Sequence, residues 1–202
     1  MAVALDPDGN RLRILRAAER LMAADGIDGV SLREINRAAG QGNASAIQYH
    51  FGDREGLVIA ILERHQVASE PHRHALLDAY TAGPGDLRAL AQALVVPLVE
   101  HLADPDGGRD YVQIAREFYT RARSLDDLGR HRDERHSMAR WNRLAATRLP
   151  QQEQRILPAR RAAVRMVLGE VARRAHDPPA SDDGVFADEL VELVAALLAA
   201  PT

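Results

Sequence analysis

Residues 31–57 read SLREINRAAGQGNASAIQYHFGDREGL, and this stretch decides the fold. Ser31 can cap a helix of about nine residues, and Glu34, three residues later, completes a capping box. A further short helix is expected between Asn43 and Tyr49. Two short helices joined by a glycine-containing turn, after a longer helix that braces them, can lay the second one in a DNA major groove. The stretch therefore predicts a helix-turn-helix.

The rest of the chain also shows helical periodicity, and no run alternates apolar and polar residues as a half-buried strand does. We predict an all-α fold of about nine helices, with proline interrupting the pattern at Pro71 and Pro97. Outside the motif the expected helices cover residues 9–25, 54–70, 72–80, 86–103, 109–123, 130–149, 157–176 and 185–199.

Composition narrows the class of protein. The 202 residues are 46% hydrophobic and 27% charged, which is typical of a globular protein, and no apolar run is long enough to span a bilayer. There is no cysteine, so disulfides and thiolate metal sites are excluded. The first ten residues do not resemble a secretory signal. We expect a cytoplasmic protein that does not interact with membranes.

The net charge of the chain does not by itself indicate a nucleic-acid partner. The net charge is −3, and residues 1–56 hold seven arginines against eight acids. Any DNA affinity must come from a local arrangement of Arg33, Arg37 and Arg54, with the acids turned elsewhere.

Packing within the motif separates buried from outward positions. Ile35, Ala38, Ala39, Ile47 and Phe51 are expected to pack the three helices together, which leaves the polar side chains of the third helix free to face DNA. The alternative for Tyr49 is that it covers the core beside Phe51.

The N-terminal quarter resembles the TetR (tetracycline repressor)/AcrR-like family of transcriptional regulators. One departure is that nine residues, rather than the usual eight, separate the Ala39-Gly40 pair from His50, so the base contacts are not assigned one by one. The residues that carry the resemblance are Ile14, Ala17, Ala18, Leu21, Gly26, Ser31, Ile35, Ala39, Gly40, Ile47, His50, Phe51, Arg54, Glu55 and Leu57.

The resemblance implies a helix-turn-helix DNA-binding domain over residues 1–56 and a helical ligand-binding and dimerisation domain over residues 57–202. It implies phosphate or backbone contacts for Ser31, Arg33, Tyr49, His50 and Arg54. Base reading then falls to Asn43, Ala44, Ser45, Ala46 and Gln48.

The last two helices are expected to pair with those of a second subunit, as the resemblance implies; the alternative is that they pack only within the chain. Their apolar faces carry Leu157, Val164, Leu168, Val171, Leu190, Val194 and Leu197.

Aromatic residues between positions 80 and 141 are candidates for a small-molecule site, with core packing as the alternative. The set, completed by polar and thioether neighbours at compatible spacing, is Tyr80, Tyr111, Gln113, Arg116, Phe118, Tyr119, Met138 and Trp141.

No cofactor and no metal are predicted. Two groups, Glu70, His72 and His74 and then His131, Glu134 and His136, lack the paired i, i+4 histidines of a helical zinc site. No nucleophile, phosphate-loop or dinucleotide motif points to an enzyme.

The sequence thus predicts a homodimeric, ligand-responsive repressor that binds a pseudo-palindromic double-stranded DNA operator and an unidentified small-molecule effector. The alternative is a helical ligand-binding or interaction protein with little DNA affinity.

Overall fold

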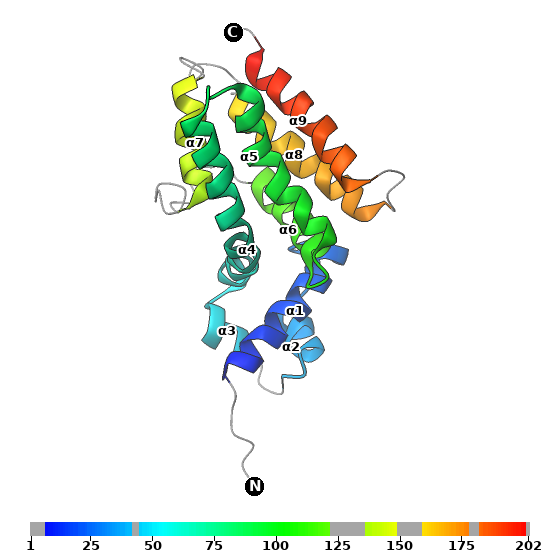
Figure 1. Ribbon diagram of the computed structural model, residues 1–202. Coiled ribbons are helices and arrows are strands. Elements are labelled where there is room, and N and C mark those ends of the chain that lie inside the picture. The colour runs from blue at the N-terminus through cyan, green and yellow to red at the C-terminus, as the bar shows by residue number, and fades with distance from the viewer. Residues whose placement is uncertain (1–6, 42–44, 122–135, 149–158, 178–181, 201–202) are drawn as a thin grey trace.

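The computed structural model describes residues 7–41, 45–121, 136–148, 159–177 and 182–200. Within these ranges it is entirely helical, so the predicted all-α fold is confirmed (Figure 1). The elements are α1 (Pro7–Asp25), α2 (Leu32–Ala38), α3 (Ala46–Phe51), α4 (Arg54–Ala82), α5 (Leu87–Val99), the 3-10 helix η1 (Glu100–Ala103), α6 (Gly108–Arg121), α7 (Ser137–Arg148), α8 (Ala159–His176) and α9 (Asp183–Ala199).

The helices form two groups joined by one long helix. Figure 1 shows α1 to α3 gathered at the N-terminal end of the molecule, α5 to α9 at the other end, and α4 running between them. Because α4 begins at Arg54 and continues to Ala82, a single helix crosses the proposed boundary between residues 56 and 57. The division into two domains stays a prediction.

The helix-turn-helix follows the local signals in the sequence. Gly26 has a φ of +86°, which favours glycine, and it ends α1. The predicted capping box of α2 is present: the Glu34 amide donates to Ser31 Oγ at 3.2 Å, and the Ser31 amide donates to Glu34 Oε2 at 2.8 Å. Ile35 and Ala39 are buried as expected, whereas Ala38 is exposed because it lies on the outer face of this short helix.

Pro71 does not end a helix, contrary to the sequence-based prediction, because α4 runs through it. Proline removes one backbone donor and leaves the carbonyl four residues earlier without its helical partner. That carbonyl belongs to Val67, whose side chain is 70% exposed, so water can hydrogen-bond to it. The helix continues because the loss falls on its solvent face.

Pro97 lies inside α5, and its surroundings are buried. Water therefore cannot satisfy the unpaired carbonyl here as it can near Pro71. The carbonyl that loses its helical partner here is that of Ala93. Arg73 of α4, only 5% exposed, donates from Nε to this carbonyl at 3.1 Å. A buried side chain therefore replaces the missing backbone donor and ties α4 to α5.

The core of the larger group forms around α5, which packs against α4, α8 and α9, while α6 packs against α8. Trp141 of α7 is fully buried and donates from Nε1 to the Leu90 carbonyl of α5 at 2.8 Å. Among the helices described, none has the length and apolar character that would let it span a bilayer.

Candidate nucleic-acid interface

One side of α3 packs against the core, and the opposite side is exposed to solvent. Ile47 is 1% exposed and packs into the core, whereas Ser45, Gln48 and Tyr49 are exposed. The helix runs over Ala46–Phe51, later than the predicted start at Asn43, and the predicted base-reading residues Asn43 and Ala44 lie outside the described residues. The six-residue helix therefore presents a polar face around Gln48.

Tyr49 points away from the protein with 83% of its surface exposed. Its ring meets the His50 ring edge-to-face at 4.9 Å, while Phe51 packs against the core beneath the Arg11 guanidinium, 5.1 Å from the ring centroid. The alternative that Tyr49 covers the core is therefore wrong. A tyrosine this exposed supplies a large contact area and a hydroxyl to a partner.

Two arginines of α2 point outward without internal partners. Arg33 and Arg37 are exposed, and within the described part of the chain neither side chain forms a hydrogen bond or an ion pair. A guanidinium that is free and solvated can bind phosphate with two parallel hydrogen bonds. Both residues are therefore available to DNA, as the sequence predicts for Arg33.

The Arg54 side chain, unlike those of Arg33 and Arg37, is hydrogen-bonded within the protein. Its Nη1 donates to the Ile27 carbonyl at 2.6 Å, which links the start of α4 to the turn after α1. Asp53 caps the same helix by accepting from the Gly56 amide at 2.8 Å. Arg54 thus positions the N-terminus of α4, and its predicted phosphate contact would have to come from the remaining guanidinium donors.

Acids of the N-terminal segment are largely engaged within the protein. Glu19 is buried, and the Asp28 carboxylate pairs with Arg121. Glu34 is held by Ser31, whose side-chain and then backbone hydrogen bonds lower the pKa of the carboxyl. Although the segment has no net positive charge, Arg33 and Arg37 of α2 are exposed and form no ion pair with the described residues, so both can approach a phosphate backbone.

The predicted ligand residues separate into lining and core positions. Tyr111, Tyr119 and Met138 border one apolar cavity among α4 to α8, together with Gln66 and Arg73 of α4. The other predicted residues lie elsewhere: Tyr80 and Trp141 are buried in the core, Gln113 donates to the Ala172 carbonyl at 2.6 Å, Arg116 is exposed, and Phe118 packs edge-to-face on Tyr119 at 5.5 Å.

The polar side of this cavity was missed by the sequence analysis. Gln66 donates from its side-chain amide to the Tyr119 hydroxyl at 2.8 Å, and Arg73 Nη1 donates to Ser137 Oγ at 3.1 Å. Burial lowers the pKa of Arg73 and raises the pKa of Tyr119. Because Gln66 and Arg73 lie seven residues apart on one face of α4, helical spacing was the available signal.

The apolar residues predicted to form a dimer surface face inward. This placement corrects the expectation, since a helical period shows which residues share a face but not whether that face meets the same chain or another. In the single chain Val171 and Val194 are 0% exposed, Leu190 is 2%, and Val164 and Leu168 are 6%; Leu197 is partly buried, and Leu157 lies outside the described residues.

Comparison with known proteins identifies the N-terminal segment. Residues 14–61 match the model of bacterial regulatory proteins of the tetR family. A stretch of 55 residues is 38% identical to the HTH-type transcriptional repressor AcnR of Corynebacterium glutamicum, covering 27% of this chain and 29% of that protein. The chain is therefore matched to less than a third of this relative.

Solved structures extend the likeness to the whole fold. NalD of Pseudomonas aeruginosa, described as the secondary repressor of the MexAB-OprM multidrug efflux pump, is 23% identical with a TM-score of 0.56, covering 94% of this chain and 96% of that one. Salmonella enterica GusR is 19% identical with a TM-score of 0.52, covering 98% and 99%.

The fold and the outward α3 define a helix-turn-helix protein with a larger helical region behind it. The matched segment ties residues 14–61 to the tetR family of bacterial regulatory proteins.

Proposed function

We propose that this chain is a ligand-responsive repressor that binds a pseudo-palindromic DNA operator as a homodimer, in the cytoplasm where such DNA is found. The observation that carries the proposal is α3, which is anchored by Ile47 and presents Gln48 and Tyr49 to solvent. A major groove accepts a helix, and its base edges can be told apart there. Two such helices, related by a twofold axis, would enter grooves about 34 Å apart or a multiple of that distance.

The outward faces of α8 and α9 are the surface we propose for dimerisation. On α8, Ala162 and Gly169 are partly exposed and lie two turns apart on one face. On α9, Leu193 is 59% exposed and Ala196 lies about one turn further along the same face. Small and apolar residues at these spacings allow two helices to approach closely. Arginines border the α8 face and glutamates border the α9 face, which favours pairing of unlike helices across a twofold axis.

The apolar cavity is the site we propose for the effector. Its lining is mostly leucine, valine and aromatic side chains, with Gln66 and Arg73 as polar groups that could orient a ligand. Both polar residues belong to α4, whose first turn packs beside α3. A ligand that contacts α4 can therefore alter the setting of the helix-turn-helix.

Release of DNA requires the effector to prefer a second conformation. If α4 moves when the cavity is filled, the two recognition helices lose the operator spacing. A differential affinity of about 1–3 kcal/mol between the two conformations changes operator affinity roughly 5- to 150-fold.

Selection of bound sequences from a random pool of duplex DNA tests the function. We expect a pseudo-palindromic consensus with half-sites one or more helical turns apart. The alternative, a helical interaction protein with little DNA affinity, predicts that no consensus is recovered. It also predicts no steep fall of affinity with salt concentration, whereas phosphate contacts produce one.

Two variants separate backbone contacts from base contacts. Arg33→Ala should weaken binding to specific and random DNA alike and lower the slope of log affinity against log salt by about 0.9 for each phosphate that the arginine neutralises. Gln48→Ala should mainly reduce discrimination among sites, by about 1–3 kcal/mol at the base it reads. Titrations on the selected operator and on a scrambled duplex measure both effects; equal losses on both duplexes for Gln48→Ala would contradict a base-reading role.

A further inference from the structure

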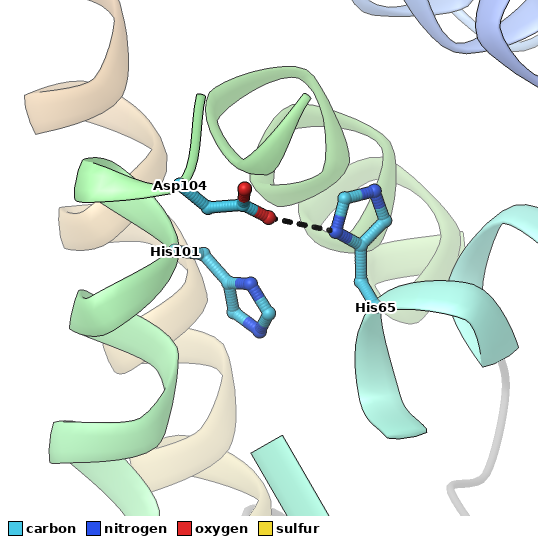
Figure 2. A group of neighbouring side chains, drawn as sticks. All are labelled: His65, His101 and Asp104. Carbon is cyan, nitrogen blue, oxygen red and sulfur yellow. Dashed lines mark ion pairs between the residues drawn. The ribbon is translucent and has the colours of Figure 1, made fainter. Parts of the chain in front are cut away.

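Three potential metal ligands, far apart in the sequence, meet where α4 passes η1. His65 belongs to α4, His101 to η1, and Asp104 directly follows η1. One ligand atom from each lies within 4.8 Å of the other two. Figure 2 shows the Asp104 carboxylate and the His101 ring facing His65 across the space between the two elements.

The local backbone explains why two of these groups point the same way. A 3-10 helix has three residues per turn, so side chains three positions apart lie one above the other. His101 and Asp104 have this spacing, and the amide of Asp104 donates to the His101 carbonyl at 3.2 Å, which closes the turn. The two ligands are therefore presented together to α4.

His101 is buried without a hydrogen-bonding partner. It is 5% exposed, and within the described residues its ring nitrogens form neither a hydrogen bond nor an ion pair. Its neighbours are the rings of Tyr111 at 4.6 Å and His65 at 5.6 Å. A cation placed between this imidazole and the two other groups would give the ring a polar partner.

His65 is oriented as metal-bound histidines usually are. Its Nε2 lies against Glu19 Oε1 in a very short contact and is 3.2 Å from Arg64 Nη1. Because a carboxylate only accepts hydrogen bonds, the contact with Glu19 requires the proton on Nε2. In the neutral ring, Nδ1 then holds the lone pair. A histidine that donates one ring N–H to a carboxylate and turns the other nitrogen to a cation is the usual arrangement in metal sites. Arg64 holds Glu19 in place by donating from Nη1 to Oε2 at 2.9 Å.

Asp104 completes the set with one free oxygen. Its Oδ1 accepts from the Asp106 amide at 2.8 Å, while its Oδ2 lies 3.6 Å from His65 Nδ1, too far for a hydrogen bond. In the tautomer with the proton on Nε2, two lone-pair atoms face each other here, an arrangement that a cation between them would stabilise. Ligands of a tetrahedral ion with bonds near 2.1 Å are about 3.4 Å apart, so this pair already has almost the required separation.

We propose that His65, His101 and Asp104 form a binding site for a divalent transition metal ion, for which zinc is the best match. Two imidazoles and one carboxylate are preferred zinc ligands, and three protein ligands leave a fourth position for water. The site departs from the sequence-based prediction of no metal. Because Glu19 belongs to α1, the bound ion would also fix α1 against α4; this consequence for DNA rests on the proposed function, whereas the site itself does not.

Zinc titration of the metal-free, full-length protein tests the site by calorimetry without DNA. We expect one ion per chain. His101→Phe keeps an aromatic ring against Tyr111 but removes the nitrogen ligands, and we expect it to weaken zinc binding by more than about 100-fold. Glu19→Gln should weaken it by about 10- to 100-fold, since it acts through His65. His176→Gln, which changes an exposed histidine at the end of α8, is the matched control and should bind zinc as the parent does.

Asp104→Asn is a second test of the site, for use if His101→Phe does not fold. The amide oxygen of the asparagine can still accept from the Asp106 amide, while the charged ligand is lost. Circular dichroism verifies that both variants are folded. The proposal is overturned if the parent binds no stoichiometric zinc, or if both folded variants bind it as tightly as the parent. Such a result would leave operator binding untouched, so failure of the metal site and failure of the regulator function are separate outcomes.

Discussion

Leu193→Glu is expected to convert the proposed dimer into a monomer and to lower affinity for the proposed operator by about 100- to 10,000-fold, because a dimer gains its second half-site without a second bimolecular step. Leu193 is 59% exposed on the outward face of α9, one residue after Glu192 and one turn after Glu189. A carboxylate there would enter the apolar centre of the twofold interface twice and lose its hydration, while the arginines of α8 lie only at the border of that surface. The measurement is the mass in solution, followed by titration of the operator.

The matched control for this prediction is Val67→Glu. Val67 is 70% exposed on α4 and carries a similar apolar side chain. We expect this variant to stay dimeric and to bind the operator as the parent does. A Leu193→Glu protein that remained a dimer of unchanged affinity would show that the outward face of α9 is not the interface.

Local signals in the sequence predicted local structure well. The capping box at Ser31 and the stop at Gly26 depend on residues only a few positions apart, so they can be recognised without knowledge of the fold. The outward position of Gln48 followed from the buried position of Ile47 for the same reason. These features account for most of the candidate DNA interface.

Features that depend on tertiary contacts could not be predicted from local sequence signals. Pro71 and Pro97 look alike as helix breakers, yet one is tolerated through solvent and the other through the buried Arg73. The inward direction of Val171 and Val194 depends on which helices stack on α5 and α6. A period of 3.6 residues shows which apolar residues share one face of a helix, but it does not show which element packs against that face.

The cluster of His65, His101 and Asp104 also depends on tertiary contacts and could not be predicted from the sequence. His65 and His101 are 36 positions apart in the sequence and carry no recognisable motif, because η1 and α4 become neighbours only in the fold. The histidine groups that did stand out form ordinary pairs: His72 Nδ1 lies 2.8 Å from Glu100 Oε1, and His74 Nε2 lies 3.3 Å from Glu70 Oε2. His131 and Glu134 lie outside the described residues.

Glu19→Ala is the second large effect that we expect, a loss of about 3–5 kcal/mol in the free energy of unfolding. The Glu19 side chain is 3% exposed and accepts from both Arg64 and His65, so its removal leaves two donors of the interior without their acceptor. Gly107, with a φ of +95°, packs so closely on Glu19 that a Cβ there would lie 2.7 Å from Oε2. The carboxylate is therefore enclosed, and water cannot easily replace it.

The comparison variant is Arg16→Ala, which breaks a pair in the same network. Arg16 Nη2 lies 2.8 Å from Asp106 Oδ1, but the two side chains are 53% and 52% exposed, so solvent screens the pair and we expect a loss of no more than about 1 kcal/mol. Urea unfolding of both variants with a metal chelator present measures the two values without any contribution from bound ions. Similar losses for Glu19→Ala and Arg16→Ala would mean that the junction between α1 and α4 is hydrated rather than buried. A much larger loss for Glu19→Ala would establish this carboxylate as a buried polar link between α1 and α4.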